Sequence, residues 1–253
     1  MFNKRHIVRT IAATVSILAL SFTAACGSGQ STASNSTDSD DITQQTYKPG
    51  KLTIATGQPA YEPWVMNDKP ESGEGYEAAV AYAVADKLGF KKSDVVWTRT
   101  AFDTAIAPGA KDWDFNIQQF GITDERKKAV DFSSSYYNDS QSVVVKKDSK
   151  FANATKVSDL KDATVGVMVG TLAYDYAKAN IKDDIQTFND DAALAQALDA
   201  GQIDALVTST VECVYMVQSE QVKDAKVLGR LPDSEDKSGM GIVLPKDSKL
   251  TAA

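Results

Sequence analysis

Two short turns in the chain combine a glycine, a threonine hydroxyl and the expected start of a helix. The first is Gln118–Thr123, which precedes a helix expected to begin at Asp124, and the second is Met168–Thr171, which precedes a helix near Leu172. The N–H groups at a helix start have no partner within the helix, so they can bind an anion. The forked donors of Arg126 suit a carboxylate. The two turns therefore predict a carboxylate site. A simpler interpretation stays open: the threonines only cap helices, and Arg126 is a surface residue paired with Glu125 or Asp131.

Aromatic residues lie in the loops that follow the first two expected strands. Tyr61 and Trp64 flank Glu62-Pro63, and Phe102 follows the second strand. Such rings can hold an apolar or planar solute. The alternative is that Trp64 and Phe102 complete the hydrophobic core.

Strand-like and helix-like segments alternate along residues 51–244. This rhythm predicts mostly parallel sheets covered by helices, arranged as two α/β lobes with a ligand site beyond the carboxyl ends of the strands. The expected strands are 51–56, 95–99, 115–120, 142–146, 164–167, 185–188, 203–207, 225–228 and 241–244, and the expected helices are 76–88, 102–106, the segment from 124, 171–180, 191–200 and 210–219.

Composition excludes several classes of function. The 253 residues carry a formal charge of −7, which does not suit a nucleic-acid binder. The only histidine is His6, and the only cysteines are Cys26 and Cys213. Once an N-terminal signal is removed, the chain holds no histidine for a catalytic triad or a metal site. Cys213 lies in an apolar helical stretch, so we expect a buried, unreactive thiol. No cofactor and no metal are expected.

The N-terminus has the pattern of an export signal. Residues 1–9 are basic, residues 11–22 are apolar, and Thr23-Ala24-Ala25-Cys26 resembles a bacterial lipobox, although Thr23 stands where an aliphatic residue is usual. We expect a signal peptide at 1–25, then a lipidated Cys26 and a disordered tether over 26–46. The alternative is an ordinary cleaved signal with an incidental Cys26.

Several motifs together resemble those of ABC-transporter extracellular solute-binding proteins, in the polar amino-acid-binding family (family 3). Residues 121–133, Gly-Ile-Thr-Asp-Glu-Arg-Lys-Lys-Ala-Val-Asp-Phe-Ser, are similar to the family's Ser/Thr-Ile-Thr-x-Glu-Arg motif and its following Asp-Phe-Ser. Supporting matches are Gly75-Tyr76-Glu77, Val169-Gly170-Thr171 and residues 201–205, Gly-Gln-Ile-Asp-Ala.

The resemblance implies a two-lobed α/β fold of the periplasmic-binding-protein type II, with the ligand cleft between lobes joined by a two-strand hinge. It places the first lobe at 47–139, the second at 140–240 and a return to the first at 241–253. The hinge candidates are Tyr136–Val144 and Met240–Val243. The family continues past Pro245-Lys246 with a helix of some twenty residues, so the C-terminal helix is expected to be missing here.

The same resemblance implies a set of ligand-binding residues, in which Arg126 binds the carboxylate of the ligand. The full set is Tyr61, Phe102, Gln118, Gln119, Gly121, Thr123, Arg126, Gly170, Thr171 and Ser209. Ser209 stands where the family commonly has the aspartate that holds a ligand ammonium, and Glu62, Asp103 and Glu212 are the candidates to replace it. The two glutamines stand where small residues are usual, which suggests a more polar ligand.

The function implied is that of a monomeric, membrane-tethered receptor. It captures a small carboxylate-bearing solute, such as an amino acid or a derivative, and delivers it to an ABC permease. Two alternatives stay open: a cyclohexadienyl dehydratase-like enzyme, with Glu62 or Glu212 as acid or base, and a ligand sensor that does not transport.

Overall fold

The structure is a computed structural model that describes residues 41–253. The expected signal peptide, Cys26 and residues 26–40 of the expected tether lie outside the described residues. The expectation of disorder is wrong for residues 41–46, which form a 3₁₀ turn at Ile42–Gln44 and bury Thr46, because Ile42 packs against the core of the first lobe. The described residues all belong to one compact unit. Within the described part, none of the helices combines the length and the apolar character needed to cross a bilayer.

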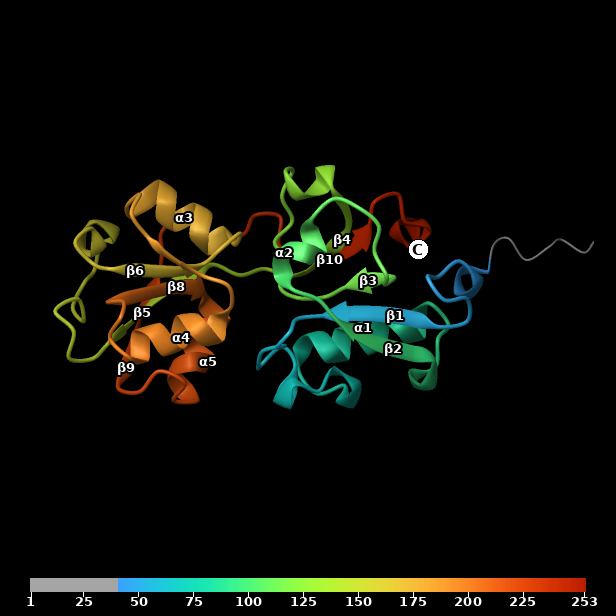
Figure 1. Cartoon of the computed structure of the whole chain (residues 1–253), viewed down its shortest axis with the longest axis horizontal. Coiled ribbons are helices and arrows are strands. Elements are labelled where there is room, and N and C mark those ends of the chain that lie inside the picture. Colours follow the sequence, from blue (N-terminus) through green and yellow to red (C-terminus); the bar gives the residue numbers. More distant parts are fainter. Residues whose placement is uncertain (1–40) are drawn as a thin grey trace, which may run out of the picture. The chain divides into compact units, whose positions relative to one another are not determined.

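The described chain folds into two five-stranded sheets, each with its own helices (Figure 1). The first sheet has the strand order β2-β1-β3-β10-β4, and the second has the order β7-β6-β8-β5-β9. The strands are β1 (Leu52–Thr56), β2 (Val95–Arg99), β3 (Phe115–Asn116), β4 (Val130–Tyr137), β5 (Gln141–Lys146), β6 (Val165–Met168), β7 (Gln186–Phe188), β8 (Ala205–Ser209), β9 (Ala225–Arg230) and β10 (Met240–Pro245). The helices are α1 (Tyr76–Lys87), α2 (Phe102–Ile106), α3 (Leu172–Asn180), α4 (Asp191–Asp199) and α5 (Thr210–Gln218). The prediction of a two-lobed type II fold is confirmed.

In each sheet three neighbouring strands pair in parallel, and one strand, β10 in the first sheet and β5 in the second, pairs antiparallel with the strand on either side of it. β2, β1 and β3 are parallel, with Ile54 opposite Trp97 and Phe115. β7, β6 and β8 are parallel in the same way, with Val167 opposite Thr187 and Val207. The parallel strands of both lobes therefore end at one edge of their sheet, and the loops that follow them are available to form a common site.

Alternating residues of the second sheet divide its core into two layers. Val143, Val165 and Val167 pack with α3 on one face, and Val144 and Leu206 pack with α4 and α5 on the other. This alternation is the period-2 geometry of a strand whose two faces are both covered. Cys213 is fully buried in the second layer and is free, so the prediction of a buried thiol is confirmed.

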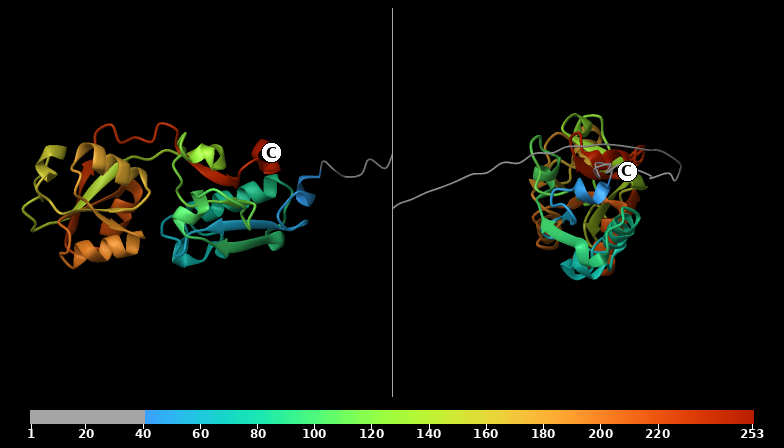
Figure 2. Two further views of the ribbon diagram at one scale, coloured as in Figure 1. Left: turned by 45° about the horizontal axis from the view of Figure 1, so that its top comes forward. Right: turned by 90° about the vertical axis from the view of Figure 1, so that its right-hand side faces the viewer.

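The chain passes between the two sheets twice, at residues 138–140 and at residues 231–239 (Figure 2). The two segments contact each other, because the amide of Asp236 donates to the carbonyl of Asp139 over 2.9 Å. The sequence placed the second crossing at Met240–Val243. Those residues instead belong to β10, which is already part of the first sheet, so the crossing lies before them.

The expected helix from Asp124 was wrong. Only a 3₁₀ turn forms, at Arg126–Lys128, and it leads directly into β4, which the sequence did not predict. Residues 124–128 are all charged, so a helix there would have no apolar face to bury, and packing is what stabilises most short helices. The expected strand 115–120 is also shorter, because Gln119 adopts a φ of +51° and leaves the sheet.

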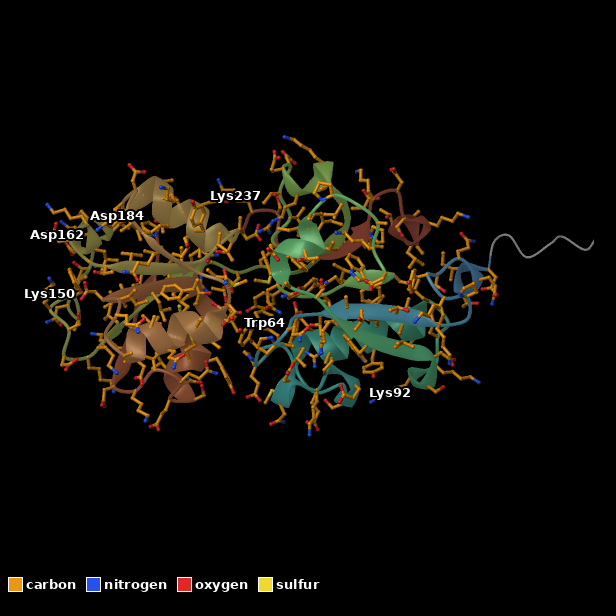
Figure 3. All side chains as sticks on the ribbon, in the orientation of Figure 1. Trp64, Lys92, Lys150, Asp162, Asp184 and Lys237 are labelled. Carbon is orange, nitrogen blue, oxygen red and sulfur yellow. The ribbon has the colours of Figure 1, made fainter. Side chains whose placement is uncertain are left out.

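Trp64 belongs to the core of the first lobe, as the alternative interpretation of the loop aromatics proposed. Its side chain is 1% exposed and meets the rings of Tyr76 and Tyr137 edge to face. Figure 3 labels Trp64 together with charged residues such as Lys92 and Asp184, which are exposed.

Gly75, at the start of α1, provides a test of this packing. Its φ is +102°, and an added Cβ would lie 2.5 Å from the carbonyl oxygen of Trp64, where only backbone could yield. We expect Gly75→Ala to lower the free energy of unfolding by about 2 kcal/mol, or the melting temperature by about 4–8 °C. Gly109→Ala is the matched control, because Gly109 has a φ of +119° and no atom within 4 Å of its added Cβ. Equal losses in the two variants would show that backbone conformation, and not the contact with Trp64, decides the effect.

Candidate functional site

A cavity of about 70 Å³, which opens to solvent, lies at the strand ends of the two lobes. All six parallel strands supply a residue that follows their carboxyl end. In the first lobe these are Tyr61 after β1, Phe102 after β2 and Gln118 and Gln119 after β3, and in the second lobe they are Thr171 after β6, Asp191 after β7 and Glu212 after β8. The site therefore occupies the position that the alternation of strands and helices predicted.

Most of the residues predicted to bind a ligand line this cavity. These are Tyr61, Phe102, Gln118, Gln119, Gly121, Arg126, Thr171 and Ser209. The other two, Thr123 and Gly170, are not part of its wall but contact Arg126. The Thr123 hydroxyl accepts a hydrogen bond from the Arg126 amide over 3.1 Å, and the Gly170 carbonyl accepts one from the guanidinium over 2.9 Å.

The Arg126 side chain is half-buried and faces the cavity. One terminal nitrogen donates to the carbonyl of Gly121 over 2.6 Å, and the other donates across the lobes to Gly170. The guanidinium carbon lies 5.4 Å from the centre of the Phe102 ring. Burial lowers the pKa of Arg126, while Asp175 and Asp236 act in the opposite direction. A guanidinium has five N–H donors, so three remain available.

The simpler interpretation of Arg126 as a surface residue does not hold. Its suggested partners have other partners: Glu125 pairs with Lys128, and Asp131 pairs with Lys246 over 2.9 Å. No ion pair of Arg126 occurs among the described residues. Thr171 does cap a helix, since its hydroxyl accepts from the Tyr174 amide over 3.2 Å. Thr171 also lines the cavity, so capping α3 does not keep it out of the cavity wall.

The aromatic residues form part of both walls. Phe102 stacks on the buried Phe120, with ring centres 4.6 Å apart, so it lines the cavity while it packs against the core. The Tyr61 hydroxyl reaches the second lobe and accepts from the amide of Ala192 over 3.4 Å. Desolvation, with smaller effects from neighbouring acids, raises the pKa of Tyr61.

A buried carboxyl holds the glutamine turn in place. Glu77, on α1, is 0% exposed and accepts from the amide of Gln119 over 2.7 Å. The side chains of Gln119 and Tyr136 also donate to it. Burial raises the pKa of Glu77 to about 7, although these hydrogen bonds oppose the shift. Glu77 therefore fixes the unusual backbone of Gln119 from behind the cavity wall.

Gly121 permits the two lobes to approach closely. An added Cβ would lie 2.5 Å from the Leu172 side chain of the other lobe and 3.0 Å from a carboxylate oxygen of Asp236. The family resemblance places a serine or threonine here more often. In this chain the absent side chain leaves room for Leu172 and Asp236 beside Arg126.

Sequence reasoning missed three of the four carboxyl groups in the cavity wall. Asp139 and Asp236 come from the two crossing segments, and Asp191 and Glu212 come from the starts of α4 and α5. Of these, only Glu212 was named, as one of three replacements for the usual ammonium-binding aspartate. Asp191 follows β7 as Thr171 follows β6, so the rule that selected Thr171 would have found it.

The other two suggested replacements do not line this cavity. Asp103 is exposed on α2, and Glu62 accepts a hydrogen bond from Tyr215. Glu62 borders a narrower pocket that shares Asp191 and Glu212 with the main cavity. Within residues 41–253 no cluster of side chains has the composition of a metal site.

The chain is similar in sequence and in structure to amino-acid-binding proteins. The chain is 28% identical to the L-arginine-binding protein of Pseudomonas aeruginosa over 219 residues, which cover 80% of this chain and 78% of that protein. Its structure is similar to that of the arginine-, lysine-, histidine-binding protein ArtJ from Geobacillus stearothermophilus, with a TM-score of 0.68, 26% identity and coverage of 80% and 85% of the two chains.

A third similarity bears on the enzyme alternative. An ancestral amino acid-binding protein, described as a precursor of cyclohexadienyl dehydratase, matches with a TM-score of 0.65 and 30% identity over 78% of this chain and 83% of that one. The family model for bacterial extracellular solute-binding proteins, family 3, matches residues 52–209. The motifs, the two-lobed fold and these matches agree: the chain belongs to the bacterial extracellular solute-binding proteins, family 3.

Proposed function

We propose that this protein is the solute-binding component of an ABC importer and that its ligand is a small carboxylate-bearing solute, an amino acid or a derivative. The observation that carries the proposal is the position of Arg126. Its guanidinium lies in the wall of a cavity formed by both lobes and keeps three N–H donors free. A charged fork with unused donors in a half-buried site is suited to a carboxylate.

The other residues of the predicted set have roles that follow from their places. Phe102 and Tyr61 enclose the ligand from the first lobe, and Thr171 presents the start of α3 from the second. A ligand that contacts both walls stabilises the arrangement in which the lobes are close, by its difference in affinity for the open and closed forms. The closed form is then the one presented to the permease.

The location and partners of the protein complete the proposal. An extracytoplasmic protein, anchored through a lipid on Cys26 and joined to the folded part by the residues between Cys26 and Asp41, would remain near a membrane permease. The ligand-bound protein acts as a monomer. Cys26 lies outside the described residues, and the permease is a separate protein. The proposals of an anchor and of a permease partner therefore rest on the sequence and on the family.

A thermal-shift screen tests the proposed function directly. The chain is heated with each of the twenty amino acids, with small peptides and with simple carboxylates. A specific ligand at a hundred times its dissociation constant should raise the free energy of unfolding by about 2.7 kcal/mol. Stabilisation by some amino acid supports the proposal, and a screen in which no carboxylate-bearing compound stabilises the protein contradicts it.

A dehydratase activity is the second candidate, and one observation favours it. Glu212 and Asp191 are buried in the cavity, and desolvation raises the pKa of each, to about 6 for Asp191. A carboxyl with a raised pKa can act as a general acid. Incubation with prephenate and arogenate tests this, because conversion to aromatic products would require an enzyme and their recovery unchanged would support binding alone.

A further inference from the structure

Two buried carboxyl groups in the second lobe share one hydrogen-bond donor. Asp191 and Glu212 are each 6% exposed, and both line the cavity. The Thr208 hydroxyl lies 3.3 Å from a carboxylate oxygen of Asp191 and 2.8 Å from one of Glu212. A hydroxyl has a single proton to donate, so at any moment one of the two carboxyl groups has no donor.

Other buried acceptor oxygens in the cavity wall also lack a hydrogen-bond donor. Three further side-chain oxygens in its wall are buried and accept no hydrogen bond among the described residues: Gln118 Oε1, Asp139 Oδ2 and Asp236 Oδ2. All are acceptors. Buried polar groups without partners are costly, so this wall is complementary to a ligand that brings several N–H donors.

The charges around the pair point to a cation. Asp191 approaches Glu212 from α4, Asp139 from a crossing segment and Glu77 from α1. Asp190, the cap of α4, lies beside Asp191, and Tyr61 faces the pair from the first lobe. No lysine or arginine of residues 41–253 forms an ion pair with Asp191 or Glu212. Arg126, the cation of the cavity wall, donates hydrogen bonds to two backbone carbonyls, and the carboxyl groups that raise its pKa are Asp175 and Asp236. Neither is a member of the pair.

We propose that Asp191 and Glu212, with Thr208 between them, form a subsite for a cationic nitrogen group of the ligand, an ammonium or a guanidinium. The acidic subsite and the basic Arg126 line the same cavity. Together they select a zwitterionic or cationic solute over a simple carboxylate. It takes over the role that Ser209 cannot fill, since the Ser209 hydroxyl accepts from the Glu212 amide as the cap of α5. This inference rests on the proposed function.

Proton release is a measurable consequence of the proposal. Desolvation raises the pKa of both carboxyl groups, and a neighbouring acid raises each further: Asp190 raises the pKa of Asp191, and Asp191 raises that of Glu212. A cation in the subsite favours the ionised forms, so binding must expel protons near pH 6. Affinity for the cationic ligand should therefore rise with pH across this range and fall on acidification.

Isothermal titration calorimetry with isosteric variants tests the subsite. The probe is L-arginine if it binds in the thermal-shift screen, and otherwise the amino acid that stabilises the protein most. We expect Asp191→Asn and Glu212→Gln each to weaken binding roughly thirtyfold or more. Asp103→Asn is the matched control, because Asp103 is an exposed acid outside the cavity, and it should bind as the wild type does.

Analogues of the probe distinguish which nitrogen enters the subsite. The 2-hydroxy acid analogue lacks the α-ammonium, and L-citrulline replaces the guanidinium of L-arginine by a neutral group of similar shape. The wild type should prefer the parent probe to one of these analogues, and Glu212→Gln should lose that preference. Titrations at pH 6 in two buffers of different ionisation enthalpy should show proton release by the wild type and less by either variant.

The outcomes separate this inference from the proposed function. If no carboxylate-bearing compound binds the wild type, both are overturned. If only carboxylates without a cationic nitrogen bind, the cation subsite alone is wrong. If an amino acid binds and neither substitution changes its affinity or its proton release, the cation subsite is wrong while the proposed function stands. If both variants unfold at lower temperature but bind with unchanged affinity, the pair is only structural and the subsite is likewise wrong.

Discussion

Arg126→Ala should weaken ligand binding at least about a hundredfold, because the ligand carboxylate would be left in the cavity without its counter-charge. The substitution also removes the donor to the Gly170 carbonyl, and with it a hydrogen bond that joins the two lobes. Calorimetric titration with the ligand found by thermal shift measures the effect.

Two further variants separate charge from geometry at this position. Arg126→Lys keeps the charge but loses the fork, so we expect it to recover only part of the lost affinity. Lys127→Ala removes a neighbouring exposed cation that does not line the cavity and should bind as the wild type does. An unchanged affinity in Arg126→Ala would show that the carboxylate is bound elsewhere.

The stability of the protein should fall as the pH rises from about 4.5 to about 7, and Glu77 should be a main cause. Its pKa is 4.5 in the unfolded chain and is raised to about 7 by burial. In this interval the folded state binds more protons than the unfolded state, so rising pH favours unfolding. The shift corresponds to roughly 3 kcal/mol of stability, complete below pH 4.5 and lost as the pH passes 7.

Urea unfolding of the wild type and of Glu77→Gln, measured between pH 4 and pH 8, isolates this contribution. The glutamine keeps the volume of the side chain and cannot ionise. The advantage of the wild type over the variant should therefore shrink by roughly 3 kcal/mol between the two ends of the range. Two parallel stability curves would show that folding leaves the pKa of Glu77 unshifted. Asp191 and Glu212 remain in both proteins, so only the Coulombic effect of Glu77 on Glu212 fails to cancel in the comparison.

The sequence predicted the frame of the fold well because its strands and helices carry strong local signals. The alternation of Val143, Val144 and Val145 and the capped helix after Thr171 appear in the structure almost at the expected positions. The turn at Gln118–Thr123 was harder. Its backbone depends on Glu77, 42 residues away, and no local pattern could reveal that this carboxyl accepts from Gln119.

The same distinction applies to the site. Residues that follow a strand within one motif, such as Arg126 and Thr171, could be named from the sequence and do line the cavity. Asp139 and Asp236 could not, because they enter the wall from the two crossing segments, whose course is set by how the lobes pack. Their approach depends on a backbone hydrogen bond between residues 97 positions apart, of which the sequence holds no local sign.

The position of β10 has a consequence for the order in which the two lobes fold during synthesis. β10 lies between β3 and β4 and pairs with both, yet it is made after every other strand in the chain. The sheet β7-β6-β8-β5-β9 draws only on residues 141–230. During translation and export we therefore expect the second lobe to fold first. The first lobe, although most of its strands are synthesised earlier, cannot complete its sheet until β10 emerges and pairs with β3 and β4.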